Sequence, residues 1–154
     1  MPLTTVYSQL QEAPAGALCA PVREGANPIN ASGATIAFGR GVVLDTDDNT
    51  VKLPASGSDA FAGVAYDNEN QPVGATGYPD GTVTGVVRQG KVMVVVEEAV
   101  TPADPVYCRY TAAGDNTPGS FRTDADSSKA FAVTQARFLR SGGPGLVPLE
   151  LNLP

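Results

Sequence analysis

The stretch that decides the fold is Thr82-Val83-Thr84-Gly85-Val86-Val87-Arg88-Gln89-Gly90-Lys91-Val92-Met93-Val94-Val95-Val96-Glu97. Valine and threonine recur on both sides of Gln89-Gly90, and β-branched residues favour extended strands. A glycine-containing pair between two such runs predicts an antiparallel hairpin with strands over residues 82–88 and 91–97. The run from Val92 to Val96 is apolar on both faces, which predicts that the core covers one face and another element or subunit the other.

Upstream of this stretch, short apolar runs alternate with turn residues. Residues 35–44 predict one strand that bends at Gly39-Arg40-Gly41, because glycine accommodates bends in strands. The run Asp45-Thr46-Asp47-Asp48-Asn49 has the composition of a turn, and together with residues 50–53 it predicts a hairpin. The polar residues 67–79 predict a surface loop that ends in the turn Pro79-Asp80-Gly81. Further short strands are expected at residues 61–66, 106–110, 121–122 and 146–153.

Residues 130–140 are the only stretch that competes as a helix. Arg137 and Arg140 interrupt the apolar stripe that an amphipathic helix would need. The alternation from Phe131 to Phe138 has one slip, and it predicts a strand with a β-bulge near Gln135.

The whole chain therefore reads as all-β. Its 154 residues suit one domain, and its 17 glycines and 13 prolines interrupt long helices. Eight or nine short strands predict a small β-barrel or a jelly-roll-like sandwich over residues 31–154. Residues 1–30 contain four prolines among alanines and glycines and predict an extended N-terminal arm. Widely spaced apolar residues of this arm suit contact with a partner surface: Val6, Tyr7, Leu10 and Leu18.

Charge and hydropathy exclude several classes of partner. The formal net charge is -6 and the ten Lys and Arg residues are scattered, so a phosphate backbone would be repelled and nucleic-acid binding is not expected. No apolar run approaches the roughly 20 residues of a membrane-spanning helix. The N-terminus lacks the pattern of a secretory signal, so synthesis in the cytoplasm is expected. In that compartment Cys19 and Cys108 are expected to be free thiols.

The inventory of reactive side chains argues against an enzyme. The chain has no histidine, which removes the commonest general base and the commonest metal ligand. Asp45-Thr46-Asp47-Asp48-Asn49 starts like a calcium-binding EF-hand loop, but Thr50 and Ser56 stand where glycine and glutamate are required. Asp124-Ala125-Asp126-Ser127-Ser128 is equally incomplete, and Cys108 beside Arg109 has no neighbouring base. No cofactor and no metal are expected.

Several short motifs follow one another in a characteristic order along the chain. They are Phe38-Gly39-Arg40-Gly41-Val42-Val43, Phe61-Ala62-Gly63-Val64-Ala65, Val87-Arg88-Gln89-Gly90-Lys91-Val92-Met93-Val94, Pro105-Val106-Tyr107, Gly119-Ser120-Phe121-Arg122, and the segment from Ala136-Arg137-Phe138 to Leu153. This ordered series resembles the structural cement or head-decoration proteins of tailed bacteriophages. The chain departs from that family at Ala103-Asp104-Pro105-Val106-Tyr107, where the family often has Gly-Asp before the strand.

This resemblance implies a non-enzymatic virion protein that binds the outer surface of the major capsid protein lattice and stabilises it. It also implies a dimer or trimer made in the host cytoplasm. Together with the arm residues, the candidates for capsid or oligomer contact are Val92, Val94 and Val96. The alternative from another class is a secreted or cell-surface β-sandwich that binds glycan or protein, which should have a signal peptide or paired cysteines.

Overall fold

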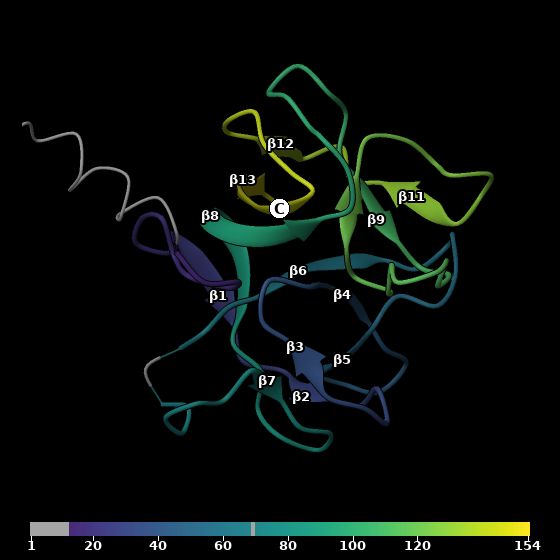
Figure 1. Ribbon diagram of the computed structural model, residues 1–154. Helices are drawn as coiled ribbons and strands as arrows, with labels where there is room; N and C mark the ends of the chain where they lie inside the picture. Colours follow the sequence, from purple (N-terminus) through teal and green to yellow (C-terminus); the bar gives the residue numbers. More distant parts are fainter. Residues whose placement is uncertain (1–12, 69) are drawn as a thin grey trace, which may run out of the picture.

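A computed structural model describes residues 13–68 and 70–154, and these residues contain thirteen strands and no helix (Figure 1). The predicted all-β class is confirmed. The strands in chain order are β1 (Glu24–Ala26), β2 (Ile29–Asn30), β3 (Ile36–Ala37), β4 (Gly41–Leu44), β5 (Thr50–Lys52), β6 (Phe61–Ala65), β7 (Gly77–Tyr78), β8 (Val86–Val96), β9 (Tyr107–Arg109), β10 (Phe121–Arg122), β11 (Ala130–Ala132), β12 (Ala136–Phe138) and β13 (Gly145–Asn152).

Eleven strands form one mixed sheet, and β3 pairs with β7 in a separate two-stranded sheet. The path of the large sheet runs β11-β9-β10-β8-β6-β4-β5-β2, and β1 and β13 also pair with β8. β12 pairs with β13 at the end of the molecule opposite to β2, β3 and β7 (Figure 1). β8 is therefore the strand on which the sheet is built.

The predicted hairpin around Gln89-Gly90 is wrong, because residues 86–96 form the single continuous strand β8. Gly90 has a φ of 154° and lies within this strand, so the chain continues instead of reversing. Each half of β8 has its own partners: β1 and β6 on one half, and β13 from Gly145↔Val96 to Asn152↔Gln89 on the other. Gln-Gly also lacks the Asn or Asp that favours a two-residue hairpin turn.

Two hydrophobic cores lie on opposite faces of the paired strands β6 and β8. Val64 and Val87 belong to the larger core, whereas Ala65 and Val86, their neighbours in sequence, belong to the smaller one. Side chains alternate between the faces of a strand, so a strand covered on both faces is apolar throughout. This double coverage explains the uninterrupted apolar sequences of β6 and of the start of β8.

Predictions for the segment upstream of β8 have mixed outcomes. The hairpin of β4 and β5 is confirmed, with Leu44 opposite Val51. The single bent strand over residues 35–44 is wrong: the chain breaks at Gly39, which has a φ of 77°, and β3 and β4 enter different sheets. The turn at Pro79-Asp80-Gly81 is confirmed by a hydrogen bond from the amide of Thr82 to the carbonyl of Pro79.

Two further segments differ in detail from the expectation. The predicted surface loop over residues 67–79 contains β7, whose Tyr78 is fully buried and donates its hydroxyl to the carbonyl of Tyr66 at 2.5 Å. Residues 130–140 are extended and not helical, as expected, but the bulge near Gln135 is wrong. A turn there separates β11 from β12, because β11 pairs with β9 and β12 with β13.

The described part of the predicted arm lies along the large sheet. The amide of Gly16 donates to the carbonyl of Met93 at 2.8 Å, and the amide of Cys19 donates to that of Lys91 at 2.9 Å. β1 and β2 continue this pairing on β8 and β5. Residues 13–30 thus complete the sheet, whereas the division of the chain at residue 30 stays a prediction.

Candidate functional site

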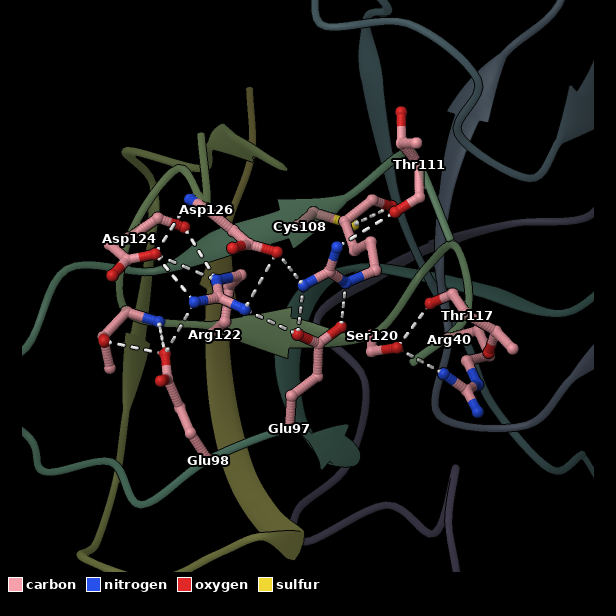
Figure 2. Close-up of polar contacts among 12 residues, drawn as sticks. Arg40, Glu97, Glu98, Cys108, Thr111, Thr117, Ser120, Arg122, Asp124 and Asp126 are labelled. Carbon is pink, nitrogen blue, oxygen red and sulfur yellow. Dashed lines mark hydrogen bonds and ion pairs between the residues drawn. The ribbon is translucent and has the colours of Figure 1, made fainter. Parts of the chain in front are cut away.

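A charged cluster occupies the junction where β8 ends and β9 and β10 pair (Figure 2). Phe121 of β10 lies opposite Val96 of β8 in parallel and opposite Cys108 of β9 in antiparallel register. This register brings together the residues that lie next to Val96, Cys108 and Phe121 in the sequence. The members of the cluster are Glu97, Glu98, Arg109, Arg122, Asp124 and Asp126.

Arg109 is the centre of the charged cluster, and its side chain has no exposed surface. Its Nε donates a hydrogen bond to Oε1 of Glu97, and its Nη2 donates one to Oε2 at 2.8 Å. Nη2 also lies 2.7 Å from Oδ2 of Asp126, and Nη1 donates to the carbonyl of Thr111 at 2.9 Å. The buried guanidinium is therefore both neutralised and hydrogen-bonded, which is what burial of a charge requires.

Arg122 extends the charged cluster toward the surface. Its Nη1 donates to Oε2 of Glu97 at 2.9 Å and its Nη2 to Oδ1 of Asp124 at 2.8 Å. The side chain of Glu98 accepts hydrogen bonds from the backbone and hydroxyl of Thr123, both at 2.9 Å. Four carboxylates and two guanidinium groups thus form one connected network.

The network lowers the pKa values of its aspartates. The hydrogen bond from Arg109 holds the pKa of Asp126 below its usual value, and the backbone amide of Asp126, followed by Arg122, does the same for Asp124. Carboxylates with lowered pKa values are poor general acids and bases at neutral pH. The geometry therefore indicates a structural role for the cluster.

Cys108 lies beside the charged cluster but is fully buried in the larger core. Burial raises the pKa of its thiol, with the charge of Glu97 acting in the same direction. Cys19 is exposed, and both cysteines are free thiols, as expected. A buried thiol with a raised pKa is inert, which agrees with the interpretation of Cys108 as a strand residue.

The two aspartate-rich runs have protein partners in place of metal ligation. Asp45 forms an ion pair with Lys52 at 3.0 Å. Asp124 accepts hydrogen bonds from Arg122 and from the amide of Asp126. Among the described residues, no group of three or more His, Cys, Asp or Glu side chains is arranged to hold a metal ion.

The structure separates the residues that the sequence nominated as capsid or oligomer contacts. Val92, Val94 and Val96 are buried in the larger core, so their side chains have no surface to offer a partner in this fold. Leu18 is 39% exposed and pairs with Val92 through its backbone. The remaining three nominated residues, Val6, Tyr7 and Leu10, lie outside the described residues.

A surface that the sequence did not reveal surrounds Leu18. Lys91, Glu150 and Arg137 lie side by side on β8, β13 and β12, and cross-strand neighbours share one face of a sheet. Their sequence neighbours Val92, Leu149 and Phe138 are buried in the larger core, so this row points away from it. We call the surface formed by this row and the two hollows beside it the outer face.

Two hollows shape the outer face. The first has a volume of about 250 Å³ and the second about 520 Å³. Residues that line the first are Ala20, Pro21, Arg23, Gly90, Lys91 and Glu150. Residues that line the second are Ala13, Leu18, Cys19, Met93, Leu139, Arg140 and Pro148. Only the alternation on β8, β12 and β13 could have indicated this face, and it required the register between strands that are distant in sequence.

In the part of the chain that the structure describes, no helix is long and apolar enough to cross a bilayer.

Comparisons with known proteins place this geometry in a family. A family model described as structural cement protein (E217 gp24/Pam3 gp6) matches residues 3–152. A chain in the solved capsid of Myoviridae phage XM1 has the same fold, with a TM-score of 0.71 and 22% sequence identity. The similarity covers 92% of this chain and 93% of the capsid chain. No curated protein matches the chain.

Proposed function

The chain belongs to the structural cement protein family of phages, and from this premise we propose that it binds the outer surface of the assembled major capsid protein lattice and stabilises it. The observation that carries the proposal is the family match over residues 3–152. The protein is a structural component of the virion, and the family is not an enzyme class. A surface adhesion or glycan-binding module, the alternative from sequence, receives no support from the family.

Preferential binding to the assembled lattice supplies the physical mechanism. A subunit that binds the assembled shell and not its dispersed proteins shifts the equilibrium away from disassembly. Many copies act on one particle, so weak individual contacts add up to a large stabilisation. The buried charged cluster and the two cores give the subunit a rigid body, which limits the entropy lost when it docks.

The predicted arm contributes contacts to a neighbouring subunit in this proposal. Proline restricts the unbound chain and so reduces the entropy lost when an extended segment is ordered on a surface. Residues 13–30 pair with β8 and β5, so a test of the arm must spare them. Only residues 1–12 are candidates for removal.

The test is a binding assay with capsids that lack this subunit. The full chain is expected to sediment with expanded capsids and to raise the temperature at which they come apart. A chain that stays in the supernatant at micromolar concentration would overturn the proposed function.

A matched pair of variants tests the arm in the same assay. Replacement of Val6, Tyr7 and Leu10 by serine should lower occupancy severalfold, because apolar contact area is lost. Replacement of Thr4 and Thr5 by serine changes the same segment without removing large apolar groups, and should leave occupancy unchanged. Equal occupancy for both variants would remove the arm from the proposal.

The proposal includes self-association as a dimer or trimer. The residues that support it differ from the valines that the sequence nominated. Val92, Val94 and Val96 of β8 are buried in the larger core of the chain itself, so they no longer argue for a partner copy. Exposed apolar residues elsewhere support it instead: Ile29 and Val83 lie opposite each other and are 41% and 56% exposed. Light scattering at micromolar concentration measures the mass directly, and a monomer there would remove this part.

A further inference from the structure

The outer face has a local charge opposite to that of the whole chain. The net charge is -6, yet three cations, Arg23, Lys91 and Arg140, line its two hollows together with one carboxylate, Glu150. A fourth cation, Arg137, bonds that carboxylate, with Nε at 2.6 Å from Oε2. The positive charge of Lys91 and Arg140 is also felt at Cys19, where it opposes the rise in the thiol pKa caused by burial. Positive charge is therefore concentrated on this face.

Exposed apolar side chains accompany these cations. Leu18 is 39% exposed and Leu146 is 36% exposed. Leu139 and Pro148 line the larger hollow beside Leu18. An apolar centre within a polar and charged rim is the usual composition of a protein docking surface. The outer face therefore combines the chemistry of an interface with two hollows.

We propose that the outer face is the docking surface of this subunit and that it binds an acidic, apolar patch of the assembled capsid protein. The inference rests on the proposed function and specifies the face used and the chemistry of the partner. A chain of net charge -6 is repelled by an acidic partner in most orientations, so a localised basic face selects the productive one. Apolar contacts around Leu18 then hold the docked subunit.

Charge neutralisation tests the basic part of the outer face with capsids that lack the subunit. Lys91→Gln combined with Arg23→Gln should weaken binding roughly tenfold at low salt and flatten the dependence of binding on salt. The matched control is Lys129→Gln, which changes a lysine that is half-buried like Lys91 and lies in the turn over residues 126–129. The control should bind as the unmodified chain does.

A second pair of variants tests the apolar part. Leu18→Ser should weaken binding several-fold, because a partly exposed leucine loses its contact area. Leu44→Ser removes an apolar side chain that is 57% exposed at the end of β4 and lines neither hollow, and it should leave capsid binding unchanged. Unfolding curves for all variants confirm that each is folded at the assay temperature.

The outcomes separate this inference from the proposed function. If the unmodified chain binds and the charge variant binds equally well with the same salt dependence, the inference is wrong and the proposed function stands. If the unmodified chain does not bind capsids, both are wrong. If the variants alter self-association in light scattering but not capsid affinity, a second copy occupies the face and the inference is overturned.

Discussion

Arg109 carries a positive charge in a position with no exposed side-chain surface, and its neighbours make this possible. Glu97 receives two of its donors, Asp126 a third contact, and the carbonyl of Thr111 another. Removal of one partner from a buried ion pair leaves an uncompensated charge, which costs more than the pair contributes. The guanidinium is therefore a point where one substitution affects the junction of β8, β9 and β10.

Arg109→Met should destabilise the protein by about 3 kcal/mol, because Glu97 then keeps only Arg122 as a cationic partner. The double variant Arg109→Met with Glu97→Gln should recover a large part of this loss, since no buried charge remains unpaired. Urea unfolding at neutral pH measures both. Equal losses for the single and the double variant would show that the packing of Arg109, and not its charge, is what matters.

The lowered pKa values of Asp126 and Asp124 determine how the stability of the protein should depend on pH. Both have pKa values lowered in the folded state, so their contribution is fully present above the ordinary aspartate pKa and is lost as pH falls toward the folded values. Stability should therefore fall below about pH 5, where the unfolded chain begins to take up more protons than the folded one.

Asp126→Asn should flatten this acid-side loss, because one of the two groups no longer titrates. The comparison is of urea midpoints at pH 6 and pH 3 for the unmodified chain and the variant. Thr46→Ser, in the exposed β4–β5 turn, changes no titrating group, so it is the control and should leave the acid-side slope as it is. Identical slopes for Asp126→Asn and the unmodified chain would contradict the role given to the Arg109 contact.

At the scale of elements, the close packing of β6 on β8 depends on Gly63. Its φ is 145°, and a Cβ there would lie 2.3 Å from the carbonyl oxygen of Val87 and 2.6 Å from Cγ1 of Val86. Neither the strand backbone nor a fully buried valine can move aside without disturbing the core. The Phe-x-Gly-Val-Ala motif thus has a structural reason at its glycine.

Gly63→Ala should cost about 3 kcal/mol or more, since it combines backbone strain with overlap in the core. Gly114→Ala separates the two effects: Gly114 has a φ of 59°, but nothing lies within 4 Å of a Cβ at that position. Backbone strain alone should cost about 1 kcal/mol there. Similar unfolding midpoints for the two variants would mean that the overlap at Gly63 is relieved.

The same elements show what the sequence could and could not predict. Local patterns identified the β4–β5 hairpin and most strand positions, because turn chemistry and β-branched runs act over a few residues. They misread Gln89-Gly90, since whether a strand reverses or continues depends on the partners of its two halves. Those partners, β13 and β6, are distant in the sequence.

The candidate site was harder to predict from the sequence, because it also depends on contacts between strands that are distant in the chain. The sequence nominated Val92, Val94 and Val96 as contacts because it showed apolar residues without showing what covers them. Lys91, Glu150 and Arg137 were individually unremarkable, and only the register of β8, β13 and β12 brings them into one row. The charged cluster likewise depends on the single parallel contact between Phe121 and Val96.

At the scale of the whole molecule, the proposed function predicts a quantitative relation between subunit concentration and capsid stability. A ligand that binds only the assembled shell adds about 1.4 kcal/mol per site for each tenfold rise in concentration above its Kd. The temperature at which capsids come apart should therefore rise linearly with the logarithm of the free subunit concentration. The slope of this line depends on the number of occupied sites, and its position along the concentration axis depends on the affinity of each site.

The charge-neutralised subunit, with Arg23→Gln and Lys91→Gln, makes this relation a discriminating test. If the outer face sets affinity and not stoichiometry, the variant should shift the whole curve by about tenfold in concentration and leave its slope unchanged. Light scattering of capsids during heating, over a concentration series of each protein, gives both quantities. A lower slope with an unchanged position along the concentration axis would mean that these residues determine how many sites fill. Capsids that bind the subunit without any rise in the temperature at which they come apart would contradict stabilisation of the shell.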